Sequence, residues 1–289
     1  MSFVIVLIAS VLFGVIPSIQ KLVLLDGVSP LVLVLICNSF SAAFTLAVCL
    51  AAHKSLAVTK RQLLDLFWIG VSLFLTDWLL NLAYTLMPVG PTTMVHFLYP
   101  SLVCAAMAVF FGQRIRLRRA AGIVLSVLGL FLMAGSFSGS SRSGVAVAAM
   151  SAAAYAFYMI ASEKTSAGRL DPGVRAFFTS AFSAVSALPA VLYRPLCLHE
   201  KIVLPATGQS WFWCLLVGAM FCAATVLLHT GIRRIGAGDV SFINMLEPVT
   251  SMLVSGALYR DTLSAAALAG CAAIAVSLLF TASSEERDV

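Results

Sequence analysis

Hydrophobic residues run along almost the whole chain in stretches of about 20, separated by short polar breaks. A helix rises about 1.5 Å per residue, so such a stretch crosses the roughly 30 Å of hydrocarbon in a bilayer. Helices are expected rather than strands, because a membrane barrel would show shorter, alternating segments. The pattern predicts ten transmembrane helices, at residues 3–25, 31–52, 62–87, 91–112, 118–136, 143–163, 173–194, 210–232, 238–259 and 264–283.

Composition supports the same class. With 61% hydrophobic and only 10% charged residues, a chain of 289 residues cannot hide its apolar surface in one soluble core. We therefore predict an all-α integral membrane protein embedded in the lipid bilayer. The net charge of +6 comes from short basic clusters between apolar runs, so we expect no nucleic-acid partner.

The basic residues also predict an orientation. Placing both termini in the cytoplasm leaves five Lys and Arg residues outside and the other 13 of the 18 inside, as the positive-inside rule requires. We expect a multi-pass protein of the plasma membrane, in a bacterium the inner membrane. The five outside residues are Lys21, Arg142, Arg194, Lys201 and Arg260.

The chain contains an internal repeat. Sliding residues 88–133 by 148 positions onto 236–281 superimposes Gly90 on Gly238 and Pro100 on Pro248. The predicted organisation is a first five-helix repeat at 1–136, a linker at 137–144 (FSGSSRSG) and a second repeat with a short tail at 145–289. Because five is odd, the second repeat enters the membrane inverted, which is typical of secondary transporters.

The third predicted helix carries an acid near its middle. Asp77, Asn81 and Tyr84 are spaced i, i+4 and i+7, so they share one face, and Trp78 flanks it. One interpretation is that Asp77 only fastens neighbouring helices. We favour a functional role, because a carboxylate in hydrocarbon costs about 3 kcal/mol or more and a Ser or Asn would fasten helices at a lower cost.

A second acid, Glu247, lies at similar depth in the ninth predicted helix, on one face with Asn244. Pro248 lacks an amide hydrogen, so we expect the Asn244 carbonyl to be free. Glu247 is either a structural residue at this break or a cavity residue. With no Lys or Arg deep in a predicted span, both acids must be protonated, neutralised by a cation or exposed to water.

Further candidates lie on three other helices. His96 and Tyr99 are expected on one face of the fourth helix, where His96 is either a satisfied hydrogen-bonding group or a proton carrier. Phe13 and Tyr155 are deeper than an interfacial belt, and such rings either pack in the membrane or attract an ammonium group by cation–π interaction. We assign Asn38 on the second helix to helix packing.

Two segments, MPVGPTTMVHFLYPSLVCAAMAVFFGQ (87–113) and IRRIGAGDVSFINMLEPVTSMLVSGALYRD (232–261), resemble the EamA branch of the drug/metabolite transporter superfamily. The resemblance covers essentially the whole chain, and its most family-like piece is the Leu246-Glu247-Pro248 motif followed by Asp261. Gln113 departs from the family, in which an acidic residue is common there. The resemblance implies alternating-access transport of small metabolites through a central cavity, but not one substrate.

The sequence as a whole predicts a secondary transporter for a small polar metabolite, amino-acid-like or an amine, with a cationic or zwitterionic cargo favoured. Proton coupling would use Asp77, His96 or Glu247. An uncoupled uniporter or channel is one alternative. An intramembrane enzyme is another, although no H-E-x-x-H or G-x-S-x-G motif is present. The predicted substrate-binding residues are Phe13, Asp77, Trp78, Asn81, Tyr84, His96, Tyr99, Tyr155, Asn244 and Glu247.

We expect no cofactor and no metal, because the seven cysteines lack CxxC spacing and mostly lie inside apolar segments. A small-molecule substrate is the expected partner. The sequence leaves open whether the protein is a monomer or a homodimer.

Overall fold

The computed structural model describes residues 2–86, 89–113, 117–134, 142–197 and 202–259, together with short helical pieces at 265–266, 268–270, 272–274 and 276–277. In these residues every regular element is a helix. The helices are α1 (Ser2–Leu25), α2 (Pro30–Ala51), α3 (Lys60–Leu86), α4 (Val89–His96), α5 (Tyr99–Phe111), α6 (Leu117–Ala134), α7 (Arg142–Lys164), the 3₁₀ turn η1 (Ser166–Arg169), α8 (Pro172–Cys197), α9 (Gly208–Ile243) and α10 (Leu246–Tyr259).

Six helices in the described part of the chain are long and apolar enough to cross a membrane, namely α1, α2, α3, α7, α8 and α9. Shorter apolar stretches lie in α5, α6 and α10. The prediction of an all-α, multi-pass membrane protein is therefore confirmed. The tenth predicted span, 264–283, and Asp261 lie largely outside the described residues.

The fourth and ninth predicted spans were wrong as single helices. Residues 91–112 are divided between α4 and α5, and residues 238–259 between the end of α9 and α10. The physical reason is proline, because Pro100 and Pro248 cannot donate the amide hydrogen bond that would continue each helix.

The two breaks are built in the same way. At the first, the amide of Phe97 donates to the Thr93 carbonyl (2.8 Å) and that of Leu98 to the Val95 carbonyl (3.2 Å). At the second, 147 positions later, Asn244 donates to Val240 (2.9 Å) and Met245 to Phe242 (3.1 Å). The sequence repeat, whose offset is 148, therefore has a counterpart in backbone geometry that is shifted by one residue.

At the polar break expected near residues 233–237, two helical segments of α9 meet at a kink, at the non-helical residue Gly236 with φ 84° and ψ 159°. This left-handed backbone favours glycine, and an added Cβ would lie 3.2 Å from Glu163 Oε2. The Glu163 carboxylate accepts a hydrogen bond from the amide of Ala237, where the helix resumes. Glu163 of α7 thus caps the N-terminus of the helical segment that begins at Ala237.

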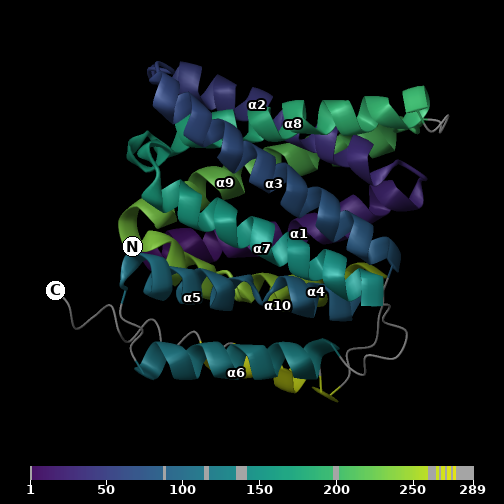
Figure 1. Ribbon diagram of the computed structural model, residues 1–289. Coiled ribbons are helices and arrows are strands. Elements are labelled where there is room, and N and C mark those ends of the chain that lie inside the picture. The colour runs from purple at the N-terminus through teal and green to yellow at the C-terminus, as the bar shows by residue number, and fades with distance from the viewer. Residues whose placement is uncertain are drawn as a thin grey trace.

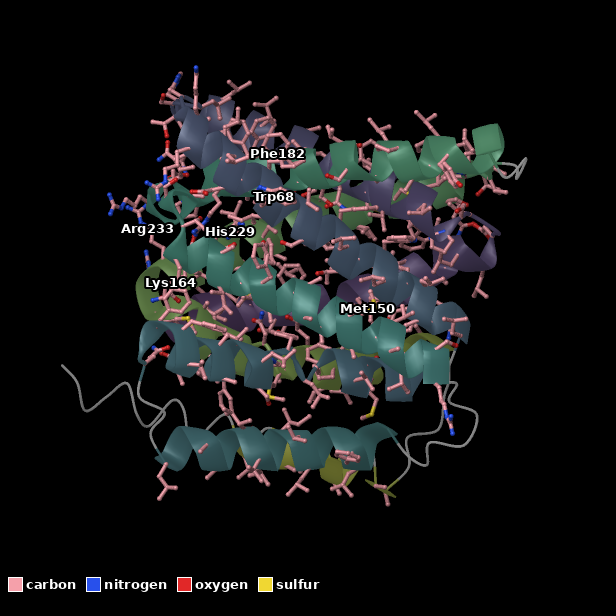
Figure 2. All side chains as sticks on the ribbon, viewed as in Figure 1. Trp68, Met150, Lys164, Phe182, His229 and Arg233 are labelled. Carbon is pink, nitrogen blue, oxygen red and sulfur yellow. The ribbon has the colours of Figure 1, made fainter. Side chains whose placement is uncertain are left out.

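Helices that are distant in sequence pack in pairs, with α1 against α9, α2 against α8 and α3 against α7 (Figure 1). Helix α6 lies at one edge of the molecule (Figure 1). Nitrogen-bearing side chains gather at the end that carries Lys164 and Arg233, whereas the lengths of the helices bear mainly carbon (Figure 2). The pairing places residues of α1, α3, α4, α7, α9 and α10 around one interior space.

Candidate functional site

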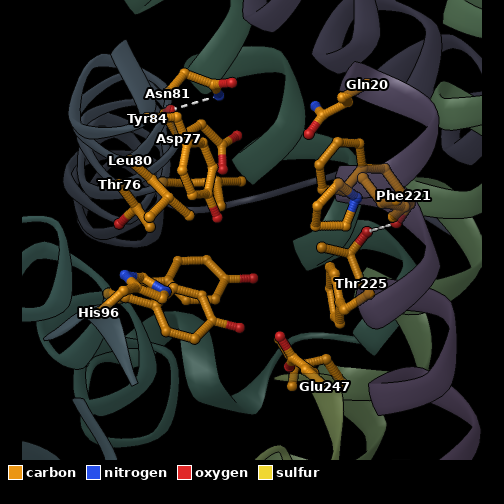
Figure 3. Close-up of a pocket in the computed structure, with 17 residues that line it drawn as sticks. Gln20, Thr76, Asp77, Leu80, Asn81, Tyr84, His96, Phe221, Thr225 and Glu247 are labelled. Atoms are coloured by element: carbon orange, nitrogen blue, oxygen red, sulfur yellow. Dashed lines mark hydrogen bonds between the residues drawn. The ribbon is translucent and has the colours of Figure 1, made fainter. Parts of the chain in front are cut away.

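A cavity of about 700 Å³, including its solvent-open mouth, lies among these six helices (Figure 3). Its walls are mainly apolar with a few polar groups, as in sites that bind small molecules. The lining residues are Phe13, Ile16, Pro17, Gln20, Leu73, Thr76, Asp77, Leu80, Asn81, Tyr84, His96, Tyr155, Tyr158, Phe221, Thr225, Leu228 and Glu247.

One polar wall is supplied by α3, whose 3.6-residue repeat turns Asp77, Asn81 and Tyr84 toward the cavity. Asn38 of α2 donates from Nδ2 to Asp77 Oδ2 at 3.3 Å. The Asn81 side chain donates back to the carbonyl oxygen of Asp77 at 2.8 Å. Asp77 therefore faces the cavity with one carboxylate oxygen held by a helix behind it.

The opposite wall carries Glu247, in the first turn of α10 (Figure 3). Its Oε1 atom is buried and has no hydrogen-bond partner among the described residues. The expectation that Pro248 frees the Asn244 carbonyl was wrong, because that oxygen accepts from the Glu247 amide at 2.9 Å. The polar atom available at this break is thus the Glu247 carboxylate.

A group of aromatic rings is centred on Tyr155. The ring of Tyr155 packs edge-on against Tyr99 at 4.5 Å between centroids, stacks on Tyr158 at 5.5 Å and lies 5.7 Å from His96. His96 Nδ1 bonds the Ser151 hydroxyl at 2.9 Å. These rings form a continuous aromatic surface beside the two acids.

Three predicted site residues do not line the cavity. Trp78 stacks on Phe74 at 5.8 Å, because it is one position, about 100° of helix, past Asp77. Tyr99 is fully buried behind Tyr155, since the break before α5 ends the face it was expected to share with His96. Asn244 accepts a hydrogen bond from the Ser10 hydroxyl at 2.9 Å.

The predicted set also left out residues that do line the cavity, among them Gln20, Tyr158 and Thr225. Gln20 follows Phe13 by seven residues, two turns along the same face of α1. Thr225 occupies the position that the 148-residue shift pairs with Asp77. Both signals were present in the sequence, whereas the contact of Asn38 with Asp77 depends on how α2 packs against α3.

Arg175 is a cation at the end of a predicted span, in the first turn of α8. This residue of α8 is fully buried. Its guanidinium donates to the carbonyls of Ser162 and, at 2.6 Å, His229. His229 Nε2 in turn bonds the Tyr158 hydroxyl at 3.2 Å. Arg175 does not line the cavity, so no cation from the described lining residues pairs with Asp77 or Glu247.

Across the described residues, no three His, Cys, Asp or Glu side chains lie close enough together to hold a metal ion. The cavity offers two carboxylates, several hydroxyl and amide groups and an aromatic surface to a bound molecule. These features define a multi-pass helical membrane protein with a polar central cavity.

The sequence profile of the EamA-like transporter family matches this chain twice, over residues 1–135 and again over 142–283. The chain belongs to the EamA-like transporter family, a family of membrane transporters. The search of curated proteins finds no similar sequence. A solved structure titled "Crystal structure of protein" has a TM-score of 0.81 and 23% identity, covering 97% of this chain and 96% of its own. At that identity the likeness establishes the fold alone.

Proposed function

We propose that this protein is a secondary transporter that moves a small cationic or zwitterionic amine through the central cavity by alternating access. The observation that carries the proposal is a cavity with Asp77 and Glu247 on opposite walls and with no Lys or Arg among its described lining residues. A buried acid without a protein cation is a site for a ligand cation or a proton. In a proton-coupled transport cycle, such an acid binds the ligand cation and the proton in turn.

The surroundings of the acids suit an ammonium group. Tyr155 and Tyr158 present ring faces or edges beside the cavity, and a cation over an aromatic face gains about 0.5–2 kcal/mol. Gln20, Asn81 and Thr225 add polar groups for a hydroxyl or carboxylate at the far end of the cargo. In a proton-coupled cycle, Asp77 or Glu247 would exchange a proton for the cargo, and His96 is a further candidate for this role.

Alternating access would follow from two inverted five-helix repeats, residues 1–136 and 145–289, joined by the linker 137–144, with ten spans and both termini in the cytoplasm. The two family matches and the equal backbone pattern at the two proline breaks support this organisation. The proposed location is the plasma membrane, in a bacterium the inner membrane. In this scheme the halves rock about the cavity and expose it alternately to the two sides.

Proteoliposomes provide the test. Purified protein would be assayed with a labelled quaternary amine, a neutral amino acid and an organic anion of similar size, with and without an imposed pH difference. We expect accumulation of the amine or amino acid against its gradient, loss of it in Asp77→Asn, and no movement of the anion. Asp171→Asn, an acid outside the cavity, is the matched control and should retain transport.

Other outcomes would replace the proposal. Equilibration without accumulation, unaffected by the pH difference, would indicate a uniporter or channel. Chemical alteration of the cargo, detected by mass spectrometry after incubation with detergent-solubilised protein, would indicate an enzyme. Preferred transport of the anion would contradict the cationic or zwitterionic cargo.

A further inference from the structure

Asn38 touches the cavity only through Asp77. It lies on α2, which supplies none of the described lining residues, and its side chain is 2% exposed. Its Nδ2 atom makes two hydrogen bonds, one to the Val34 carbonyl at 3.1 Å and one to Asp77 Oδ2 at 3.3 Å. Both amide hydrogens of Asn38 are therefore in use.

The bond to Val34 fixes which end of the amide faces the acid. If the amide turned over, its oxygen would face the Val34 carbonyl, acceptor against acceptor, and that arrangement is unfavourable. Asn38 thus always presents an N–H group to Asp77. An N–H group bonds a carboxylate oxygen well, and a charged acceptor makes such a bond stronger. A protonated carboxyl can accept from this donor only through a neutral oxygen, in a weaker hydrogen bond.

We propose that Asn38 is a positioning residue that selects the ionised form of Asp77 and turns its other oxygen toward the cargo. This inference rests on the proposed role of Asp77 in binding cargo or protons. It distinguishes the two cavity acids, because Glu247 Oε1 has no donor among the described residues. Asp77 is then the acid that carries the negative charge when only one of the two is ionised.

No neighbouring cation competes with Asn38 for this role. The titratable groups that face Asp77 from the elements around it are Cys37 of α2, Tyr84 of α3, His96 of α4, Tyr155 and Tyr158 of α7, and Glu247 of α10. The buried cation Arg175 of α8 directs its guanidinium at the Ser162 and His229 carbonyls instead. The donor to the Asp77 side chain in the described structure is the Asn38 amide.

The test is the pH dependence of binding of tetramethylammonium to the full-length protein in detergent, measured by calorimetry. Binding of a cation needs the charged form of Asp77, so it is lost as the pH falls. Replacing Asn38 by Leu, which has the same number and branching of side-chain heavy atoms and cannot donate, favours the protonated acid. We expect the midpoint of this loss to move up by about one pH unit, a tenfold change in proton affinity.

Two further variants separate this role from packing. Asn38→Ser keeps a hydroxyl able to bond Val34 but does not reach Asp77, so it should shift the midpoint in the same direction even if Asn38→Leu folds poorly. Ser41→Ala removes an equally buried α2 side chain that bonds Ser180 of α8, at 3.1 Å, and should leave the midpoint unchanged. A purely structural role for Asn38 would lower stability in its variants without moving the midpoint.

The possible failures are distinguishable. If Asp77→Asn retains the wild-type affinity and pH dependence, the proposed function of Asp77 is wrong, and this inference is wrong with it. If Asp77→Asn loses binding but both Asn38 variants keep the wild-type midpoint, only the inference about Asn38 is overturned. If tetramethylammonium does not bind the wild-type protein at any pH, the cationic cargo is contradicted.

Discussion

The acids that line the cavity have few hydrogen-bond partners in the protein, whereas the acids at one end of the helix bundle are well paired. At the end that carries η1, which we call the paired end, each acid of a set of three has a protein partner. The Asp65 carboxylate accepts from the Ser166 amide at 2.9 Å and from its hydroxyl, Asp171 pairs with Lys54 at 2.7 Å, and Glu163 contacts Ala237 and Lys164. In the cavity, Asp77 has one amide donor and Glu247 Oε1 has none among the described residues.

The difference indicates two uses of the same functional group. Two of the contacts at the paired end, Asp65 with Ser166 and Lys54 with Asp171, join segments more than 100 residues apart, so they contribute to the packing of the helices there. The cavity acids contribute little of this kind. Their unused acceptors are the part of the molecule best suited to bind a cation or a proton.

The largest expected effect is on transport by Asp77→Asn. Loss of the charge should reduce cation transport at least tenfold, because a hydrogen bond to a charged group is worth about 1.5–3 kcal/mol. The measurement is the initial rate in proteoliposomes, normalised to inserted protein. Asp171→Asn, an equal change at the paired end, should keep most of the rate. Equal losses in the two variants would remove the distinction between the regions.

At the paired end, Asp65→Asn should lower stability by about 1–3 kcal/mol, because the carboxylate accepts two hydrogen bonds from Ser166. Thermal unfolding in detergent would measure this. Combining Asp65→Asn with Ser166→Ala should destabilise less than the sum of the two single changes, since both break the same contact. If the losses of stability in the two single variants added up fully in the double variant, the contact between Asp65 and Ser166 would be contradicted.

The corresponding change in the cavity, Glu247→Gln, should leave stability within about 0.5 kcal/mol of the wild type while weakening cation binding. The reason is that Glu247 Oε1 has no partner to lose among the described residues. Thermal unfolding and calorimetry on the same preparation would test both parts. A loss of stability as large as that of Asp65→Asn would show that Glu247 is structural.

The smallest effect is the pH response of Asp171. Burial by itself raises the pKa of this carboxyl, but the hydrogen bond and charge of Lys54, with the amides of Gly173 and Val174, outweigh burial and lower it. A lowered pKa stabilises the fold above the ordinary value of 3.8, and this contribution is lost as the pH falls through the lower folded-state value.

Because the side chain of Asp171 is 39% exposed, its ion pair with Lys54 should contribute only about 0.5 kcal/mol. The difference in melting temperature between wild type and Asp171→Asn should therefore be small near neutral pH and disappear as the pH falls from 3.8 through the lower folded-state pKa. If the difference in melting temperature grew as the pH fell, the pKa of Asp171 would be raised in the folded protein and not lowered.

Much of the fold could be predicted because hydrophobic length is a local property. The bounds of α1, α2 and α7 differ by at most one residue at each end from the predicted spans 3–25, 31–52 and 143–163. The fourth and ninth spans were predicted less well. Pro100 and Pro248 were visible, but a proline inside an apolar run kinks, breaks or merely bends a helix according to its neighbours.

The candidate site was predictable where helical spacing alone places a side chain, as with Asp77, Asn81 and Tyr84 on α3. It was not predictable where two elements must meet. Trp78 and Asn244 turn into packing contacts, and Arg175, counted with the cytoplasmic basic residues, is fully buried against two carbonyls. Whether these residues are cavity, core or surface depends on the neighbouring helices.

The sequence by itself determined that this protein is a helical membrane protein with two similar halves, because apolar length, proline position and repeat are written along the chain. Only the tertiary structure decided that Asp77 and Glu247 face one another across a cavity and that Asn38 holds one of them. The physical reason is that a helix fixes the angle between its own side chains, whereas the partner of each side chain is set by the packing of helices distant in sequence.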